Sequence, residues 1–258
     1  VALVQAHLAW GDVDANLRDF DKRVRSCKGC DMIVFPELFT SGCEMKKRDK
    51  EEAVCSKDGV ASYYPLVIKR MRKWAKRSGA LVVGSTIYKE EGKYYNRLLA
   101  VYPDGKYEYY DKHNCFKKGS FSPGDRHLTL EWKGIRFSTY ICYDLRFPEI
   151  FQISSERSEV IFVIANWPQE RIGQWDILLN ARAVENQAYV LGINRTGGLH
   201  YCASSVAYDP FGHRIAGGSE EEIVIAEITP GLAASYRKDF PVKQDRQRDL
   251  YERFLKER

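Results

Sequence analysis

The sequence has no apolar run long enough to cross a membrane and no cysteine pattern typical of a disulfide framework. A transmembrane helix needs about 18–20 consecutive apolar residues, and the N-terminal segment lacks the basic start of a signal peptide. Seven cysteines in 258 residues fit free thiols in a reducing compartment better than a small disulfide-stabilised scaffold. We therefore expect a cytoplasmic protein that does not contact a membrane.

Blocks of charge of one sign are also absent. The 40 basic and 35 acidic residues are interleaved, which gives a net charge of +5 without the basic stripe that a nucleic-acid partner would require. Hydrophobic residues make up 44% of the chain, so a large core is available and extensive disorder is excluded. The length and the lack of linkers or repeats predict a single α/β domain over residues 1–258.

Strand and helix patterns alternate along the chain, as in α/β proteins. Apolar runs predict strands over 1–10, 31–35, 80–88, 135–141, 160–167, 190–195 and 222–228, and turn residues predict hairpins at 91–93, at 103–105 and over 204–215. Apolar residues at helical spacing predict helices over 13–24, 60–79 and 173–189. Residues 234–258 are either a tail that packs on a partner subunit or a surface helix, and we favour the surface helix.

Three reactive side chains follow predicted strands at the point where each strand ends. Glu37 follows the strand over 31–35, Lys112 follows a β-rich run, and Cys142 follows the strand over 135–141. Ligands of open α/β sheets bind at the carboxyl ends of strands. We therefore expect the three side chains to line one pocket.

Cys142 is the strongest candidate for a nucleophile. A turn between a strand and a helix exposes the side chain and offers the backbone N–H of Tyr143 to a developing oxyanion. We expect the N-terminus of the following helix to lower the pKa of the thiol. The alternative is a buried structural cysteine, and the polar residues that follow Cys142 argue against it.

Glu37 and Lys112 fit the supporting roles in amide hydrolysis. Glu37 would accept the thiol proton and later activate water, and the Lys112 ammonium would stabilise the oxyanion and keep Glu37 ionised. The alternatives are a structural acid and a surface lysine. His113 is a second candidate for the base.

Residues just beyond the strand over 160–167 are candidates for substrate contacts. Trp167, Arg171 and Trp175 lie there. A substrate with a distal carboxylate would need a cation, because burial of an unpaired charge is unfavourable. Arg171 is our first choice and Arg195 our second, although either could equally be structural.

Cys27 and Cys30 form a CxxC pair, a pattern that can bind zinc or act in redox chemistry. The sequence has no second such pair and no histidine pair at zinc spacing. We therefore expect no metal site.

Several segments together resemble the nitrilase superfamily in order and spacing, from the first strand to about Ile228. They are FPELFTSG, YDKHNCF, YICYDLRFPE, ANWP and ARAVENQAYVLGINRTG. The resemblance implies a four-layer α-β-β-α sandwich, a triad of Glu37, Lys112 and Cys142, a thioester acyl-enzyme, and neither a metal nor an organic cofactor. It also implies a homodimer formed by stacking of the sheets.

CYDLRFPE and ANWP are most similar to the omega-amidase-like branch. That branch implies hydrolysis of a small monoamide such as 2-oxoglutaramate or 2-oxosuccinamate to the acid and ammonia. Two alternatives stay open: an N-carbamoyl amino-acid or aliphatic amidase, and a catalytically weak binding or scaffold member.

The sequence departs from the family pattern in the loop after Lys112. The family carries a second glutamate there that helps to position the lysine and the substrate, whereas residues 113–124 contain no acid. This loop and the turn before His200 are also short for the family. Either the glutamate is absent and the activity is weak, or loop residues are missing from the sequence, and we favour missing residues.

Overall fold

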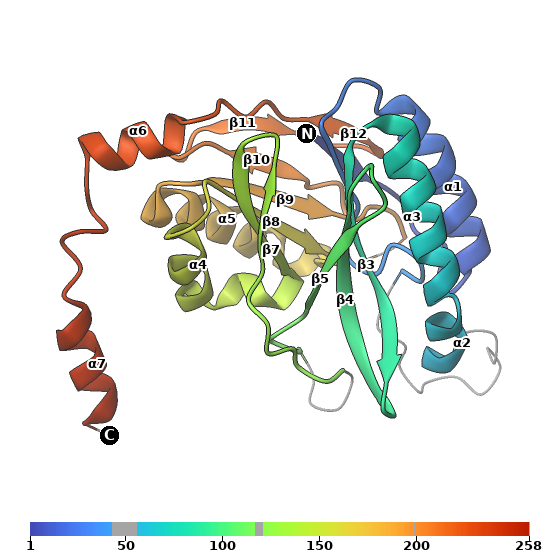
Figure 1. Cartoon of the computed structure of the whole chain (residues 1–258), viewed down its shortest axis with the longest axis horizontal. Helices are drawn as coiled ribbons and strands as arrows, with labels where there is room; N and C mark the ends of the chain where they lie inside the picture. Colours follow the sequence, from blue (N-terminus) through green and yellow to red (C-terminus); the bar gives the residue numbers. More distant parts are fainter. Residues whose placement is uncertain (43–55, 117–120, 199, 258) are drawn as a thin grey trace.

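The computed structural model describes residues 1–42, 56–116, 121–198 and 200–257. Two six-stranded sheets pack face to face, with helices on their outer faces (Figure 1). The first sheet has the order β12 (Glu222–Ile225), β1 (Ala2–Gln5), β2 (Met32–Val34), β3 (Leu81–Glu90), β4 (Lys93–Val101) and β5 (Tyr107–Asp111). The second has the order β11 (Arg214–Gly217), β10 (Val206–Tyr208), β9 (Tyr189–Asn194), β8 (Val160–Ala165), β7 (Ile135–Ile141) and β6 (Thr129–Trp132). The predicted four-layer sandwich is confirmed.

Helices cover the outer face of each sheet. Figure 1 shows α1 (Val13–Ser26) and α3 (Tyr64–Ser78) beside the first sheet and α4 (Pro148–Ser155) and α5 (Ile172–Asn186) beside the second. The side chain of Asp12 caps α1 by accepting the N–H of Ala15. The apolar positions of α1 that the helical spacing predicts are buried: Val13, Leu17, Phe20 and Val24.

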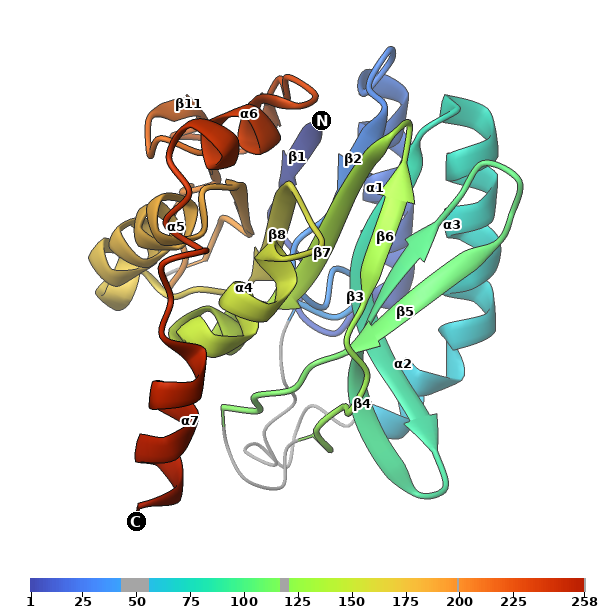
Figure 2. The ribbon, with the colours of Figure 1, turned by 60° about the vertical axis from the view of Figure 1, so that its left-hand side comes forward.

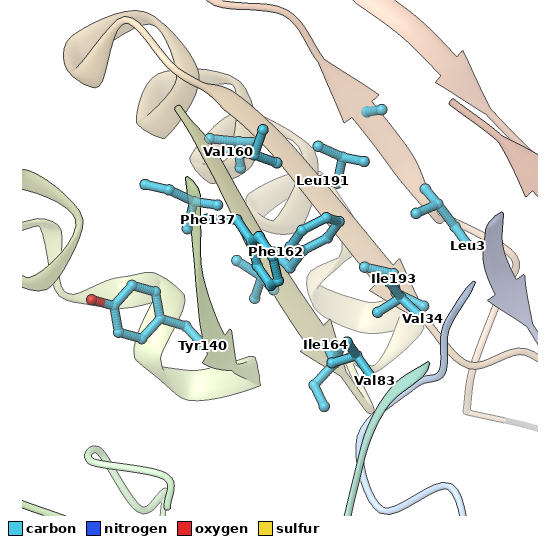
Figure 3. Packing of buried hydrophobic residues seen from close by; sticks show 14 of the residues in the cluster. Leu3, Val34, Val83, Phe137, Tyr140, Val160, Phe162, Ile164, Leu191 and Ile193 are labelled. Atoms are coloured by element: carbon cyan, nitrogen blue, oxygen red, sulfur yellow. The ribbon is translucent and has the colours of Figure 1, made fainter. Parts of the chain in front are cut away.

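The strands of the first sheet contribute to two separate cores, because neighbouring residues of a strand point to opposite faces. Leu3 and Val34 lie in the core shared with the second sheet, near Ile193 (Figure 3). Val4 points the other way and packs in the core that includes Phe20 of α1. The site described below therefore rests on strands that are packed on both faces.

Two local predictions need correction. The helix expected over 60–79 is divided into α2 (Lys57–Ser62) and α3, which are separated at Tyr63. Pro65 lies in the first turn of α3, where its missing N–H is tolerated. The strand expected over 1–10 ends at Gln5, and a 3-10 helix over Cys142–Arg146 precedes α4.

The C-terminal segment contains α6 (Leu232–Asp239) and α7 (Arg248–Lys256). No residue of α7 is buried, and the helix projects away from both sheets in Figure 1 and Figure 2. In the part of the chain that the structure describes, no helix is both long and apolar enough to cross a bilayer.

Candidate active site

Glu37 lies in the loop after β2, and its carboxylate accepts hydrogen bonds from three donors. It is 3% exposed, and its Oε1 atom accepts the amide of Asn96 and the ammonium of Lys112, each at 2.8 Å. Its Oε2 atom accepts the backbone N–H of Asn166 at 2.9 Å, directly after β8. Strands of both sheets therefore fix the position of the Glu37 carboxylate.

Lys112 follows β5 and is almost completely buried. Its backbone N–H donates to the carbonyl oxygen of Asn96 at 3.0 Å, which extends the pairing of β4 and β5 by one residue. Burial alone would lower the pKa of Lys112, but the charge of Glu37 and the hydrogen bond to it raise the pKa above its ordinary value. The ammonium therefore stays charged beside Glu37.

Cys142 follows β7 with a backbone φ of 48°, in the left-handed region that non-glycine residues rarely adopt. The residue keeps partial contact with solvent although protein surrounds its sulfur. Burial, the charge of Glu37 and a hydrogen bond to Glu37 raise the pKa of the thiol well above its ordinary value, against the opposing effects of Lys112 and the Asn166 N–H. The expected lowering of this pKa is therefore wrong: at neutral pH the thiol keeps its proton and holds it next to a carboxylate.

A pocket of about 360 Å³ has in its wall the residues that directly follow Lys112 and Cys142 in the chain. Glu37, Lys112 and Cys142 are not among its lining residues, so the expectation that the three side chains line one pocket is not met by this pocket. Tyr143, the residue after Cys142, lies in its wall with its ring 5.2 Å from that of Phe116 and 5.3 Å from that of Phe147. The described residues that line the pocket are His113, Asn114, Cys115, Phe121, Pro123, Tyr143 and Phe147. The volume suits a small substrate.

His113 lines the pocket, but its ring is bonded elsewhere. Its Nε2 atom lies 3.0 Å from the carbonyl oxygen of Arg126, and its ring packs on Tyr110 with centroids 4.7 Å apart. The thiol instead forms its hydrogen bond with Glu37. The geometry favours Glu37 over His113 as the base.

Comparison with known proteins identifies the family of the chain. The sequence pattern of the carbon-nitrogen hydrolase family matches residues 1–238. The chain belongs to this family. The sequence is 36% identical to the omega-amidase YafV of Escherichia coli K12 over 95% of each chain, and 32% identical to the 2-oxoglutaramate amidase of Bacillus subtilis over 97% and 98%.

Solved structures lead to the same family. A CN-hydrolase superfamily protein of Xanthomonas campestris, which carries an arsenic adduct in its active site, matches with a TM-score of 0.85 and 32% identity over 95% and 96% of the two chains. Nit3 of Saccharomyces cerevisiae, from branch 10 of the nitrilase superfamily, matches with a TM-score of 0.81 and 26% identity over 96% and 95%. The resemblance that the sequence motifs indicated is confirmed, and the protein is an amidase-type hydrolase.

The two tryptophans expected near the substrate are core residues of the hydrolase. Each is 1% exposed, and their rings lie 5.4 Å apart. Trp167 donates to the carbonyl oxygen of Arg171 at 2.8 Å, and Trp175 donates to that of Ser204 at 2.9 Å. Trp167 thus holds the backbone of Arg171, and direct contact of either ring with substrate stays a prediction.

The two candidate arginines differ in their surroundings. Arg171 is exposed, and its guanidinium lies 5.9 Å from the ring of Phe116, which packs on the pocket residue Tyr143. Arg195 is buried and donates to the carbonyl oxygens of Gly42 and Leu8 at 2.6 and 2.9 Å. Arg171 is therefore the better placed to meet a substrate anion, although the role of each arginine stays a prediction.

Sequence reasoning missed three polar residues at the site: Asn96, Asn166 and Asp144. Asn166 carried a usable signal because it directly follows a buried strand, as Glu37 and Cys142 do. Asn96 lies inside β4, so only the strand register reveals that it faces Glu37.

Two sequence predictions concern loops that the structure describes only in part. Residues 117–120 of the loop after Lys112, and residue 199 before His200, lie outside the described residues. The expectation that these loops are incomplete, and with it the place of a second glutamate, stays a prediction.

The CxxC pair has an ordinary place in the fold. Cys27 lies at the C-terminal end of α1, and its thiol donates to the carbonyl oxygen of Arg23 at 3.3 Å. Burial raises the pKa of Cys27 to about 12, so the thiol is unreactive at neutral pH. Among the described residues, no group of three metal-binding side chains is assembled here or elsewhere.

Proposed function

We propose that this hydrolase is an omega-amidase in which Cys142 is the nucleophile, Glu37 the general base and Lys112 the cation that stabilises the oxyanion. The observation that carries the proposal is the buried Glu37–Lys112 pair, bonded at 2.8 Å, next to the Cys142 thiol, whose pKa burial and the Glu37 carboxylate raise. A neutral thiol that touches a carboxylate loses its proton only as it attacks a carbonyl carbon.

The first half of the reaction forms the thioester. As the sulfur of Cys142 bonds to the amide carbon, its proton passes to Glu37, and the carbonyl oxygen becomes an oxyanion. The Lys112 ammonium and the N–H of Tyr143 stabilise this oxyanion. Glu37 then returns the proton to the leaving nitrogen, the C–N bond breaks, and ammonia departs.

The second half of the reaction restores the enzyme. Glu37 accepts a proton from water as the water oxygen attacks the thioester carbon, and the C–S bond breaks. The sulfur recovers a proton, and the carboxylic acid leaves. Each step uses groups that lie in one buried cluster, so no metal or organic cofactor is needed for the balance of atoms and charge.

The substrate class is supported by the names of the relatives, an omega-amidase and a 2-oxoglutaramate amidase, at 36% and 32% identity. An omega-amide of a dicarboxylic acid carries a carboxylate at its other end. Arg171, which lies beside the Phe116 ring that packs on the pocket residue Tyr143, would pair with it. We expect 2-oxoglutaramate or 2-oxosuccinamate to be hydrolysed faster than an N-carbamoyl amino acid or an uncharged aliphatic amide.

The test is ammonia release from this panel by the purified chain and by Cys142→Ala. Ammonia from the monoamides that disappears in Cys142→Ala supports the proposal. Faster hydrolysis of the N-carbamoyl or aliphatic amides would show that the proposed substrate class is wrong. Activity that survives in Cys142→Ala would refute the mechanism, and no ammonia from any amide would favour the scaffold alternative.

We also propose that the protein is a homodimer. Ile177 and Val184 lie seven residues apart on α5, therefore on one helix face, and are 68% and 48% exposed. Together with the exposed rings of Phe211 and Phe240 they define the α5 surface. Exposed apolar groups of this kind mark an interaction site.

The apolar side of α7 supports a second copy as the occupant of the α5 surface. Tyr251, Phe254 and Leu255 are exposed on a helix that contacts the body of its own chain little. We expect a mass twice the chain's 29.8 kDa in light scattering, and a monomer for Ile177→Glu. Lys93→Glu, an exposed charge change on β4, should remain dimeric. A monomeric parent chain would refute the homodimer.

A cytoplasmic location is proposed on the state of the cysteines. The five cysteines that the structure describes, residues 27, 30, 115, 142 and 202, all carry free thiols, as expected in a reducing compartment. Cell fractionation followed by the amidase assay tests the location, and activity confined to a membrane or secreted fraction would refute it.

A further inference from the structure

Asp144 is a fully buried carboxylate that the reaction described above does not use. Its Oδ2 atom accepts the hydroxyl of Tyr110 at 2.9 Å and the backbone N–H of Ile141 at 3.0 Å. Its Oδ1 atom accepts the backbone N–H and the side-chain amide of Asn114 at 2.8 and 3.0 Å. A buried carboxylate with four donors is held in one position.

These four bonds join the segments that carry two of the three proposed catalytic residues. Tyr110 lies in β5 two residues before Lys112, and Asn114 lies two residues after Lys112. Ile141 is the last residue of β7 and directly precedes Cys142. Asp144 therefore connects an edge of the first sheet to the strand of the second sheet that ends at the nucleophile.

The hydrogen bond from the backbone N–H of Ile141 to the side chain of Asp144 also closes a ring of bonded atoms. This ring includes the backbone of residues 141–144, and Cys142 within it has a φ of 48°. A non-glycine residue keeps a left-handed backbone only when its surroundings determine it. The side chain of Asp144 provides this restraint.

The charge of Asp144 acts on Lys112 as well. Burial raises the pKa of Asp144, and the positive charge of Lys112 opposes that rise most strongly. In return, Asp144 is one of the groups that raise the pKa of Lys112. Lys112 therefore interacts with two buried carboxylates: it donates a hydrogen bond to Glu37, and it is attracted by the charge of Asp144 without a direct bond.

We propose that Asp144 is a positioning residue for amide hydrolysis. Its four hydrogen bonds hold the turn of Cys142 against the segment around Lys112. This inference rests on the proposed catalytic roles of Cys142 and Lys112 and adds a residue that does not touch the substrate.

The test compares Asp144→Asn with Tyr110→Phe. The asparagine has the shape of the aspartate but lacks its charge, and its NH₂ cannot accept the N–H of Ile141 while its oxygen accepts Asn114. We expect kcat to fall about 10–100-fold with KM changed less than about threefold.

Tyr110→Phe removes one donor but keeps the charge and the ring around Cys142. We expect a smaller loss of kcat, below about fivefold. Circular dichroism melts establish that both variants fold. Asp144→Asn with a lower melting temperature but parental kcat and KM would show that Asp144 has only a structural role and would overturn the proposal.

Alkylation of Cys142 by iodoacetamide separates this inference from the proposed function. If the parent chain releases no ammonia from any amide, the proposed function fails, whereas alkylation still reports on the turn. Once the ring opens, the thiol should lose burial and its contact with Glu37, so the apparent pKa of alkylation should fall in Asp144→Asn and not in Tyr110→Phe. Identical alkylation profiles of Asp144→Asn and the parent would overturn the inference.

Discussion

Two buried ion pairs lie on opposite sides of β4 and β5, and they differ in the number of hydrogen bonds that join the two partners. Arg97 reaches Asp111 through two hydrogen bonds of 2.8 and 2.7 Å, whereas Lys112 reaches Glu37 through one of 2.8 Å. Asp111 and Lys112 are consecutive, so they point to opposite sides of the sheet. The same two strands therefore position both pairs.

The neighbours of the two pairs differ more than the pairs themselves. The Arg97 guanidinium lies 3.6 Å from the ring centroid of Tyr88 and 3.9 Å from that of Tyr109, so aromatic rings cover both of its faces. The Glu37–Lys112 pair instead borders the buried thiol of Cys142. An ion pair enclosed by aromatic rings fixes the strand register, whereas a carboxylate that borders a protonated thiol can accept the thiol proton during attack.

The largest effect is expected at the pair that borders the thiol. Glu37→Gln removes the proton acceptor, so kcat for ammonia release should fall about 10²–10⁴-fold. Glu131→Gln, a matched change of an exposed acid, should keep the parental rate. A Glu37→Gln enzyme with more than a tenth of the parental kcat would remove Glu37 from the mechanism.

The enclosed pair should affect stability more than chemistry. Arg97→Met leaves Asp111 buried without its partner, so the free energy of unfolding in urea should fall by about 3–5 kcal/mol. The double variant Arg97→Met/Asp111→Leu should recover most of this loss, because no buried charge remains. A double variant as unstable as Arg97→Met would instead assign the stability to the tyrosine contacts.

A third ion pair, between α1 and α3, should have a smaller effect that depends on pH. Burial alone would raise the pKa of Asp21, but hydrogen bonds from Trp74 and Arg25 and the charge of Arg77 lower it to about 2. This stability is present above the ordinary value of 3.8 and is lost as the pH falls through about 2. Asp21→Asn should therefore lower the free energy of unfolding by about 1–2 kcal/mol at pH 7.

The pH dependence of that difference sharpens the test of Asp21. In urea titrations, the gap between parent and Asp21→Asn should narrow as the pH is lowered from 4 to 2, because the carboxyl of the parent becomes protonated. A gap that stays constant over this range would assign the effect to packing and not to charge.

Metal removal should have the smallest effect. The proposed reaction uses a thiol, a carboxylate and an ammonium, so prolonged treatment with EDTA should leave kcat for ammonia release unchanged. Activity that is lost with EDTA and restored by a divalent cation would contradict the proposed mechanism.

The strand ends could be predicted from the sequence because buried parallel strands are continuous apolar runs. Reactive residues directly after such runs, as with Glu37 and Cys142, indicate one edge of the fold without coordinates. The family motifs then assigned Lys112, which a β-rich run alone identifies less clearly. The structure brings Glu37 and Lys112 into direct contact.

Properties that depend on packing could not be predicted in this way. The pKa of Cys142 depends on the balance between the following helix and the burial beside Glu37, and the balance is opposite to the sequence-based expectation. The contact of Asn96 with Glu37 depends on the register of β4 with β5. The break at Tyr63 between α2 and α3 leaves the helical periodicity intact, so the pattern predicted one helix.

The central claim is that the thiol of Cys142 becomes acylated during turnover beside the Glu37–Lys112 pair. Rapid acid quenching of the enzyme with 2-oxoglutaramate, followed by peptide mass spectrometry, tests it most directly. The account predicts the mass of the substrate acyl group on the peptide that contains Cys142, formed together with the first equivalent of ammonia. A full equivalent of ammonia released without any acylated Cys142 peptide would contradict it.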